Sequence, residues 1–407
     1  MLDPRQFVDA VDGPAALNFL AEMIRFKSYS GEPGEVDLAR FMVDAMKKLG
    51  LEAGLSPVPK NRFNAIGTLK GTGGGKSLLF NGHMDTNPVT GNWTVDPWGG
   101  VYDDEFIYGI GVSNMKSGDA AAFMAVKMLT DAGVKLKGDI ILEYVVGELQ
   151  GGIGTVNAIE NGVKADCFVN MEPTDLNGLT LHAGSFNVTI ELAGVTRHMS
   201  KREEAVDAIA AAAILIPRIN EISFSGAANA EHASVNRANI GVIRGSLSPE
   251  FHDWRPPQVA DFVRMSGTVR YGPSQSIDTV LADLRSLLDN LEVEIPGLKT
   301  TVVKQFADER PSMLPFEMEK SAPIVKSVRK AFKSIRDHDQ QIGPVTPYCF
   351  YGTDAAHLQS RAAMPGIVCG PGGRYNTMPD ERVDIVDYLD AIRIYLLTIL
   401  DVCEASS

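Results

Sequence analysis

The chain has 407 residues, and its 51 acidic side chains outnumber the 38 Lys and Arg side chains, which gives a formal net charge of -13 at pH 7. A surface of this sign repels nucleic acids and anionic membranes, so we expect neither as a partner. Hydrophobic residues make up 44% of the chain and charged residues 22%, a balance typical of proteins that build buried cores. Because a single core stops growing near about 250 to 300 residues, this length predicts two domains.

Targeting signals and cysteine patterns give no sign of an exported protein. The first residues, MLDPRQFVDAVDG, include acidic side chains and no apolar stretch, so they predict neither a secretion signal nor a transit peptide. No apolar run approaches the roughly 18 to 20 residues that span a bilayer. The four cysteines are far apart and form no CxxC pair, which favours buried free thiols over disulfides or a thiolate zinc site. We expect a cytoplasmic protein.

The first 175 residues alternate helical and strand patterns, which predicts an α/β domain with a mixed sheet flanked by helices. Helical periodicity covers residues 13–26, 36–49 and 116–129, and apolar runs predict strands at 77–80, 140–146 and 167–171. Each strand run leads into a potential ligand: His83, Glu148 or Glu172. Open α/β sheets bind ligands at the carboxyl ends of their strands, so this repetition predicts a functional site there.

The pattern changes near His182, where we expect an inserted α+β domain with a four-stranded sheet and two helices. Its predicted strands cover residues 186–192, 240–244, 261–271 and 300–306, and its helices cover 203–216 and 276–291. A helix at 322–335, a strand at 367–369 and a helix at 385–400 then return to the first domain. The predicted organisation is therefore a catalytic domain of residues 1–182 and 307–407, interrupted by a second domain of residues 183–306.

Short polar motifs occur in a fixed order along the chain. They are His83-Met84-Asp85, Asp96-Pro97-Trp98, the segment YGIGVSNMK at 108–116, Gly147-Glu148, Met171-Glu172-Pro173, the segment GVTRH at 194–198, and Gly370-Pro371-Gly372 before TMPDE at 377–381. A His can ligate a metal, and a nearby carboxylate can hold its imidazole in the required tautomer. Over nearly the whole chain, this order resembles the M20 family of metallopeptidases and amidohydrolases.

The resemblance implies a catalytic domain interrupted by a smaller lid domain that commonly mediates dimerisation. It also implies two divalent metals about 3.5 to 4 Å apart, as in other two-metal hydrolases. At the matching positions, His83 and Glu172 are ligands of one metal, and Asp85 is the partner of the His83 imidazole. Glu148 is the general base, and His198 of the lid stabilises the developing oxyanion.

Three positions depart from the family pattern, and together they are the set that would hold the second metal. Asn114 replaces a bridging Asp, Leu149 replaces the second Glu of a Glu-Glu pair, and Asn376 replaces a His near the C-terminus. Leu149 offers no lone pair to a cation, whereas the Asn114 amide oxygen remains a weak ligand. We therefore predict one labile divalent metal, Mn²⁺ or Zn²⁺, held by His83, Glu172 and Asn114.

Substrate contacts are less defined by the sequence. Arg270, Arg255 and Asn239 of the lid are candidates for binding a substrate carboxylate, although each is equally readable as a solvated polar side chain on the surface. Arg374 and Asn376 are candidates for the region where relatives hold the second metal. The aromatic run at 348–351 and Trp254 are readable either as pocket walls or as core.

The function expected from these features is metal-dependent hydrolysis of a C–N bond in a small carboxylate-bearing substrate. One specific hypothesis is deamination of 5-nitroanthranilate to 5-nitrosalicylate, in which Glu148 would activate a water that attacks the ring carbon. The alternatives are an N-acyl amino acid deacylase or carboxypeptidase-like amidohydrolase, and a non-catalytic binding protein. The lid domain leads us to expect a homodimer or a larger homo-oligomer.

Overall fold

The computed structural model describes residues 4–252, 257–305 and 311–406. Within this part of the chain, no helix is both long enough and apolar enough to cross a membrane. The chain divides into two compact units. The larger unit comprises Met1–Leu181, Phe316–Tyr348 and Thr353–Ser407, and the smaller unit comprises His182–Pro315 and Cys349–Gly352.

A mixed sheet forms the centre of the larger unit, as the sequence predicted, and it has eight strands. Its strands, in spatial order, are β1 (Glu52–Val58), β2 (Arg62–Leu69), β5 (Ile140–Val145), β3 (Leu78–His83), β6 (Cys167–Pro173), β15 (Gly366–Gly370), β7 (Gly178–Leu179) and β14 (Ile342–Gly343). The central strands β5, β3, β6 and β15 run parallel, and β1, β2 and the contact of β15 with β7 are antiparallel. The carboxyl ends of β3, β5 and β6 therefore lie at one edge.

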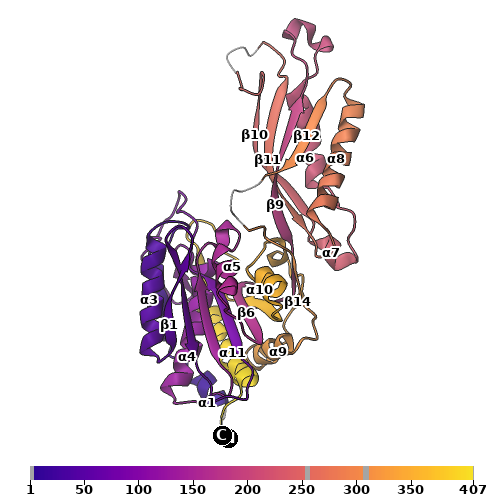
Figure 1. The fold of residues 1–407 in the computed structure, drawn as a ribbon. Coiled ribbons are helices and arrows are strands. Elements are labelled where there is room, and N and C mark those ends of the chain that lie inside the picture. Colours follow the sequence, from indigo (N-terminus) through magenta and orange to yellow (C-terminus); the bar gives the residue numbers. More distant parts are fainter. Residues whose placement is uncertain (1–3, 253–256, 306–310, 407) are drawn as a thin grey trace. The chain divides into compact units, whose positions relative to one another are not determined.

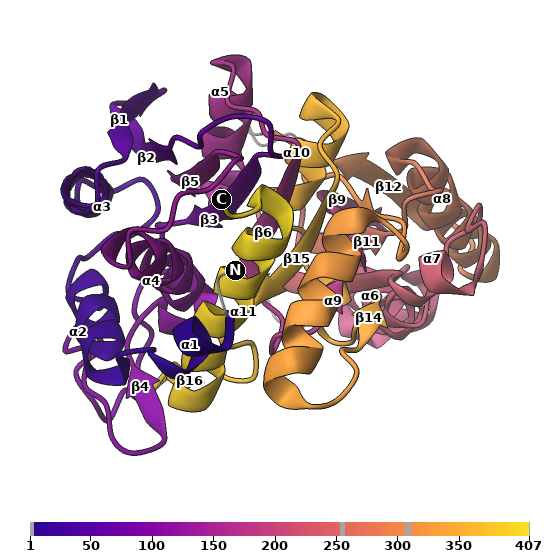
Figure 2. The same cartoon turned by 90° about the horizontal axis from the view of Figure 1, so that it is seen from below.

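Helices cover both faces of this sheet (Figure 2). On one face lie α3 (Gly34–Lys48), α4 (Ser117–Asp131), α9 (Pro323–Arg336) and α11 (Ile385–Cys403). On the other face lie α5 (Ile153–Glu160) and α10 (Ala355–Ala362). The remaining helices, short helical turns and strands of the larger unit are α1 (Pro4–Asp9), α2 (Gly13–Ile24), η1 (Val112–Lys116), η2 (Glu148–Gln150), η4 (Tyr348–Phe350, which runs into the smaller unit), β4 (Phe106–Tyr108), β13 (Phe316–Glu317) and β16 (Arg382–Asp384).

Strand alternation decides which side chains of the central strands face which helices. Leu78 and Phe80 of β3 and Val169 of β6 belong to the apolar core shared with α4 and α11. Because successive side chains on a strand point to opposite faces, His83 and Glu172 belong to the other set, on the α5 and α10 side. Polar side chains thus gather on one face of the sheet while the opposite face is apolar.

The smaller unit contains a four-stranded antiparallel sheet and two long helices (Figure 1), as predicted. The sheet order is β10 (Arg237–Ser246), β11 (Phe262–Tyr271), β9 (Gly184–Ala193) and β12 (Lys299–Lys304). Apolar side chains of α6 (Ala208–Asn220) and α8 (Ile277–Glu294) form one core with the sheet. The short elements are β8 (Leu181–His182), η3 (Met199–Glu204) and α7 (Ala230–Ser234).

Some local predictions differ from the structure. The helix predicted from residue 203 begins only at Ala208, because Asp207 caps it by accepting a hydrogen bond from the Ala210 amide, and residues 199–204 form a tighter turn. Strands β1 and β2 and helix α10 were not predicted. All four cysteines are buried free thiols, as their spacing predicted.

Candidate metal centre

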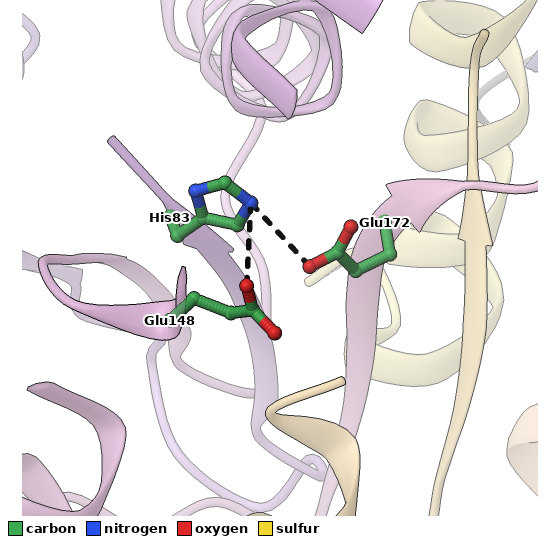
Figure 3. Close-up of side chains that lie close together, drawn as sticks. All are labelled: His83, Glu148 and Glu172. Atoms are coloured by element: carbon green, nitrogen blue, oxygen red, sulfur yellow. Dashed lines mark ion pairs between the residues drawn. The ribbon is translucent and has the colours of Figure 1, made fainter. Parts of the chain in front are cut away.

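Three buried side chains meet where the central parallel strands end. His83 is the last residue of β3, Glu172 lies near the end of β6, and Glu148 begins the turn that follows β5. None of the three residues is more than 8% exposed. Their potential ligand atoms all lie within 4.8 Å of one another. Figure 3 shows both carboxylates turned toward the same imidazole nitrogen.

The distances identify that nitrogen as Nε2 of His83. It lies 3.5 Å from Glu172 Oε1 and 4.0 Å from Glu148 Oε2 (Figure 3). The amide oxygen Oδ1 of Asn114 lies 3.1 Å from the same nitrogen. The structure thus brings together four of the residues that the sequence singled out.

The other side of the imidazole fixes its tautomer. His83 Nδ1 lies 2.8 Å from the backbone carbonyl oxygen of Asp85. A carbonyl only accepts hydrogen bonds, so Nδ1 carries a proton, and in the neutral ring the Nε2 lone pair faces the cluster, as a metal ligand requires. The Asp85 carboxylate is 3.5 Å from Nδ1. It also accepts hydrogen bonds from Ser30 Oγ, at 2.7 Å, and from the Gly147 amide, at 2.8 Å.

Burial and mutual repulsion shift the proton affinities of these groups. Burial, followed by the Glu172 charge, raises the pKa of the Glu148 carboxyl well above its usual range. Burial likewise raises the pKa of Glu172 to about 7. For His83, burial lowers the pKa of the imidazole, but the carboxylates of Glu172, Asp85 and Glu148 outweigh burial and raise it well above its usual value. The buried carboxylates therefore favour a positive charge in the cluster, supplied either by protons or by a metal cation.

This set of potential ligand atoms fits a divalent cation. When the imidazole is neutral and both carboxyls are ionised, the atoms facing one another are an imidazole lone pair, two carboxylate oxygens and an amide oxygen, and all four are acceptors. Buried acceptors without a donor are costly unless a proton or a cation neutralises them. One imidazole with oxygen ligands suits Mn²⁺ or Zn²⁺. A metal bound here would be held by His83, Glu172 and Asn114, with Glu148 beside it.

A second group of polar residues lies next to Asn114, and its hydrogen bonds are already made. Ser113 Oγ donates to Asn376 Oδ1 and accepts a hydrogen bond from the Gly373 amide at 3.0 Å. The buried Glu381 carboxylate accepts from the amides of Ser113, at 2.9 Å, and Asn114, at 3.1 Å. Glu381 was part of a recognised motif, but the sequence gave no reason to assign it to the Asn114 turn.

Arg374 is bound within the larger unit. Its guanidinium contacts Asp175 Oδ2 at 2.9 Å, Asp387 Oδ2 at 2.9 Å and Asp384 Oδ2 at 3.6 Å. Tyr348 of the aromatic run donates its hydroxyl proton to the same Asp175 carboxylate, at 2.6 Å. A role for Arg374 toward an anionic group of the substrate stays a prediction, and it would have to compete with these three carboxylates.

The remaining predicted residues belong to the smaller unit. His198 is exposed and lies 3.0 Å from Ser200 Oγ through its Nδ1 atom. Arg270 and Asn239 lie on the paired strands β11 and β10. Arg237, opposite Arg270 in this pairing, stacks its guanidinium 3.5 Å from the centre of the Phe350 ring. Arg255 and Trp254 lie outside the described residues, and the roles given to these side chains stay predictions.

Comparisons with known proteins show which family and which relatives the chain resembles. The sequence model of the family described as Peptidase family M20/M25/M40 matches residues 79–401. The chain is 26% identical over 370 residues to an N-formyl-4-amino-5-aminomethyl-2-methylpyrimidine deformylase of Bacillus subtilis, covering 84% of this chain and 83% of that protein. It is 26% identical over 365 residues to an acetylornithine deacetylase of Shigella sonnei, covering 87% of each chain.

A solved structure supports the same fold. The aminopeptidase PepT of Bacillus cereus superposes with a TM-score of 0.75 at 19% sequence identity, covering 97% of this chain and 100% of that one. At this identity the likeness concerns the fold alone. It confirms the predicted class, a mixed sheet flanked by helices together with a separate small sheet domain.

Proposed function

The chain belongs to peptidase family M20/M25/M40 and is a metal-dependent hydrolase of C–N bonds, and we propose that it hydrolyses the amide bond of a small N-acylated amine that carries a carboxylate, using one divalent metal. The names of both relatives, a deformylase and a deacetylase, describe removal of a short acyl group. The match to the family model confirms the family that the ordered motifs indicated. Removal of a short acyl group is our more specific proposal.

The observation that carries this proposal is the convergence of three oxygen atoms, from Glu148, Glu172 and Asn114, on His83 Nε2, since all four atoms can bind a cation. Support for a single metal comes from the three replaced positions. Leu149 follows Glu148 directly and has no ligand atom, and Asn376 is already bonded to Ser113. A small molecule is the partner class that a buried site of this kind suits.

In the proposed reaction, each residue of the larger unit has a distinct task. A divalent metal, when bound, polarises the amide carbonyl and makes water more acidic. Glu148 accepts the proton of the attacking water and passes it to the departing amine nitrogen, a task that suits a carboxyl with a raised pKa. Asp85 orients Glu148 by holding the backbone of the Glu148 turn, because Asp85 Oδ1 accepts hydrogen bonds from the amides of Gly147 and Glu148, at 2.8 and 3.3 Å. His198 remains our candidate for stabilising the oxyanion.

The comparisons argue against two of the functions that the sequence had left open. Deamination of 5-nitroanthranilate has no support, because the relatives reported above are named for deformylation and deacetylation. A non-catalytic binding protein is not retained, since those relatives cover 84% and 87% of the chain and are named as hydrolases. An N-acyl amine is therefore the substrate class to test first.

The test is a substrate panel on the purified protein loaded with Mn²⁺ or Zn²⁺. The panel contains N-formyl and N-acetyl amines, each with and without a carboxylate, and 5-nitroanthranilate as a comparison. We expect release of primary amine from the acylated carboxylates and no ammonia from 5-nitroanthranilate. Failure to release amine from any acylated compound, or equal release by Glu148→Gln, would overturn the proposal.

Assembly and location are further proposals. We propose a homodimer or a larger homo-oligomer in the cytoplasm. Support for assembly comes from apolar side chains on the smaller unit, where Val242 and Ile243 of β10 are 55% and 49% exposed, and Ile209 and Ile214 of α6 are 47% and 42% exposed. Sedimentation equilibrium of the full chain tests this, and a monomer at all concentrations would contradict it.

A further inference from the structure

Glu148 is carried by an unusually glycine-rich turn. Gly147, Gly151 and Gly152 all have positive φ angles, of 80°, 91° and 79°. A Cβ at Gly147 would lie 2.8 Å from Arg62 Nη1, and one at Gly152 would lie 2.2 Å from Asp354 Oδ1. The turn is therefore packed on both sides by charged groups, and glycine is the residue that permits both the close approach and the backbone conformation.

On one side, His357 of α10 holds the backbone of this turn. Its Nε2 atom lies 2.9 Å from the carbonyl oxygen of Gly151. A carbonyl only accepts, so Nε2 carries a proton. Burial lowers the pKa of the His357 imidazole, so the ring is neutral and has this single N–H to give. Within the described part of the chain, Nδ1 has no hydrogen-bond partner.

The start of α10 is in turn tied to the central sheet by a chain of buried hydrogen bonds. Asn170 Nδ2 donates to Asn81 Oδ1 at 2.7 Å, and Asn81 Nδ2 donates to Thr155 Oγ1 at 3.0 Å. Thr155 Oγ1 donates to Asp354 Oδ2 at 2.7 Å. Asp354 is the residue before α10, and His357 lies in its first turn. The donors all point the same way, so strands β3 and β6 fix the position from which His357 reaches Gly151.

On the opposite side, Arg62 holds the same turn. Its guanidinium donates to both oxygens of Glu35, at 2.6 and 2.8 Å, and its Nη1 donates to Gln150 Oε1 at 2.6 Å. Asp85 holds the first amides of the turn, as described above. Three independent contacts therefore restrain a segment whose glycines would otherwise have the greatest backbone freedom.

We infer that His357, on the helix whose start Asp354 anchors to Thr155, is a positioning residue that aims the Glu148 carboxylate by fixing the Gly151 carbonyl. This inference rests on the proposed function in one respect, namely that Glu148 is the general base. His357 has no part in binding the metal. Its effect is geometric, and misplacement of a catalytic group by about 1 Å costs about 100-fold in rate.

The decisive comparison uses His357→Phe, which keeps a ring but removes the donor, and His357→Gln, which keeps an N–H group. The first readout is amide hydrogen exchange of residues 147–152 in the full chain, which needs no substrate. We expect faster exchange in His357→Phe and near-native exchange in His357→Gln. His338→Phe is the matched control, because that exposed ring also faces a backbone carbonyl, Asp339 O at 3.2 Å, and should change nothing.

The second readout is hydrolysis. We expect His357→Phe to lower kcat about 10- to 100-fold with little change in KM, and His357→Gln to restore most of the rate. In a Glu148→Gln background, His357→Phe should cost nothing further, because two residues that act as one unit are not additive. Mn²⁺ affinity measured by calorimetry should be unchanged.

Two results would overturn the inference: unchanged exchange in the turn, or an equal rate loss in the Glu148→Gln background. If His357→Phe does not fold, Thr155→Val provides a related test, since it removes the hydroxyl that links Asn81 to Asp354, and a smaller loss in the same direction is expected. If no acylated compound is hydrolysed by the native protein, the proposed function fails, while the exchange experiment still decides whether His357 holds the turn.

Discussion

Two neighbouring groups of polar residues in the larger unit differ in how their hydrogen bonds are satisfied. Around His83 Nε2, two carboxylates and an amide oxygen converge, and the carboxylates outweigh the effect of burial and raise the pKa of His83. Around Ser113, the donors and acceptors match: its hydroxyl binds Asn376 and Gly373, and its amide binds Glu381. The first group favours a positive charge, either protons or a metal cation, and the second group does not. The family resemblance places a ligand of the second metal at Asn376, so this difference supports one metal in place of two.

The largest effect is expected from removing the imidazole at the centre of the first group. His83→Ala should abolish Mn²⁺ binding and hydrolysis together, because the remaining carboxylates and amide lose the ligand on which they converge. Isothermal titration with Mn²⁺ measures this directly, and His338→Ala on the exposed surface is the control. Native Mn²⁺ affinity in His83→Ala would show that the cluster is not the metal site.

Glu148→Gln should separate catalysis from metal binding. The variant keeps the size of the side chain but cannot accept the proton of water, so we expect kcat to fall by about 10² to 10⁴. Titration should still give one Mn²⁺ site, because His83, Glu172 and Asn114 are unchanged. A variant with native kcat would remove Glu148 from the mechanism.

The comparison itself is tested by restoring the ligands that the family pattern places at the second metal. The triple variant Asn114→Asp, Leu149→Glu and Asn376→His adds two carboxylates and an imidazole at the positions where relatives bind the second metal. We expect the stoichiometry measured by titration to rise from one to two divalent ions per chain. Two ions of similar affinity in the native protein would contradict the single-metal proposal.

A smaller effect is expected on the pH dependence of stability. Burial raises the pKa of Glu143 to about 8 from its usual 4.5. Between these values the folded state keeps a proton that the unfolded state has lost, so the free energy of unfolding falls as pH rises, by about 1.4 kcal/mol per pH unit. Above about pH 8 this contribution is constant.

Glu143→Gln cannot titrate, and its amide oxygen can still accept from Asn81, which donates to the native carboxylate at 2.9 Å. Urea unfolding at pH 5, 6.5 and 8 should therefore show a shallower loss of stability in the variant than in the native chain. Glu105→Gln, at an exposed position, is the control. Equal slopes in the native chain and Glu143→Gln would mean that Glu143 is already charged at pH 5.

The predicted elements that matched the structure are those with a strong local pattern. Strands β3, β5 and β6 are buried along their whole length, so their apolar runs were visible and led to His83, Glu148 and Glu172. Strand β1 was missed because only its last residue, Val58, is buried, and β2 because it contains the buried polar residues Arg62 and Asn64. Helix α10 has only 8 residues, too few for a helical period to be evident.

Contacts between distant parts of the chain account for what the sequence did not reveal. His357 bonds to a carbonyl 206 residues away, and Asp354 bonds to a hydroxyl 199 residues away. Asp85 was expected to orient His83 through its carboxylate, which lies 3.5 Å from Nδ1. The structure adds two contacts that the sequence did not reveal: the Asp85 backbone carbonyl accepts a hydrogen bond from Nδ1, and the carboxylate also binds the Glu148 turn. Such roles depend on which groups meet in space, and no local pattern encodes them.

The sequence alone determined the acidic charge, the family, the sheet class and the identity of the ligand candidates, because charge, ordered motifs and strand periodicity are properties of short segments. Only the tertiary structure decided that His83, Asn114, Glu148 and Glu172 converge, that the Nε2 lone pair faces the carboxylates, and that Ser113 and Asn376 already satisfy each other. The physical reason is that hydrogen bonding and burial are settled between segments that meet only when the sheet assembles.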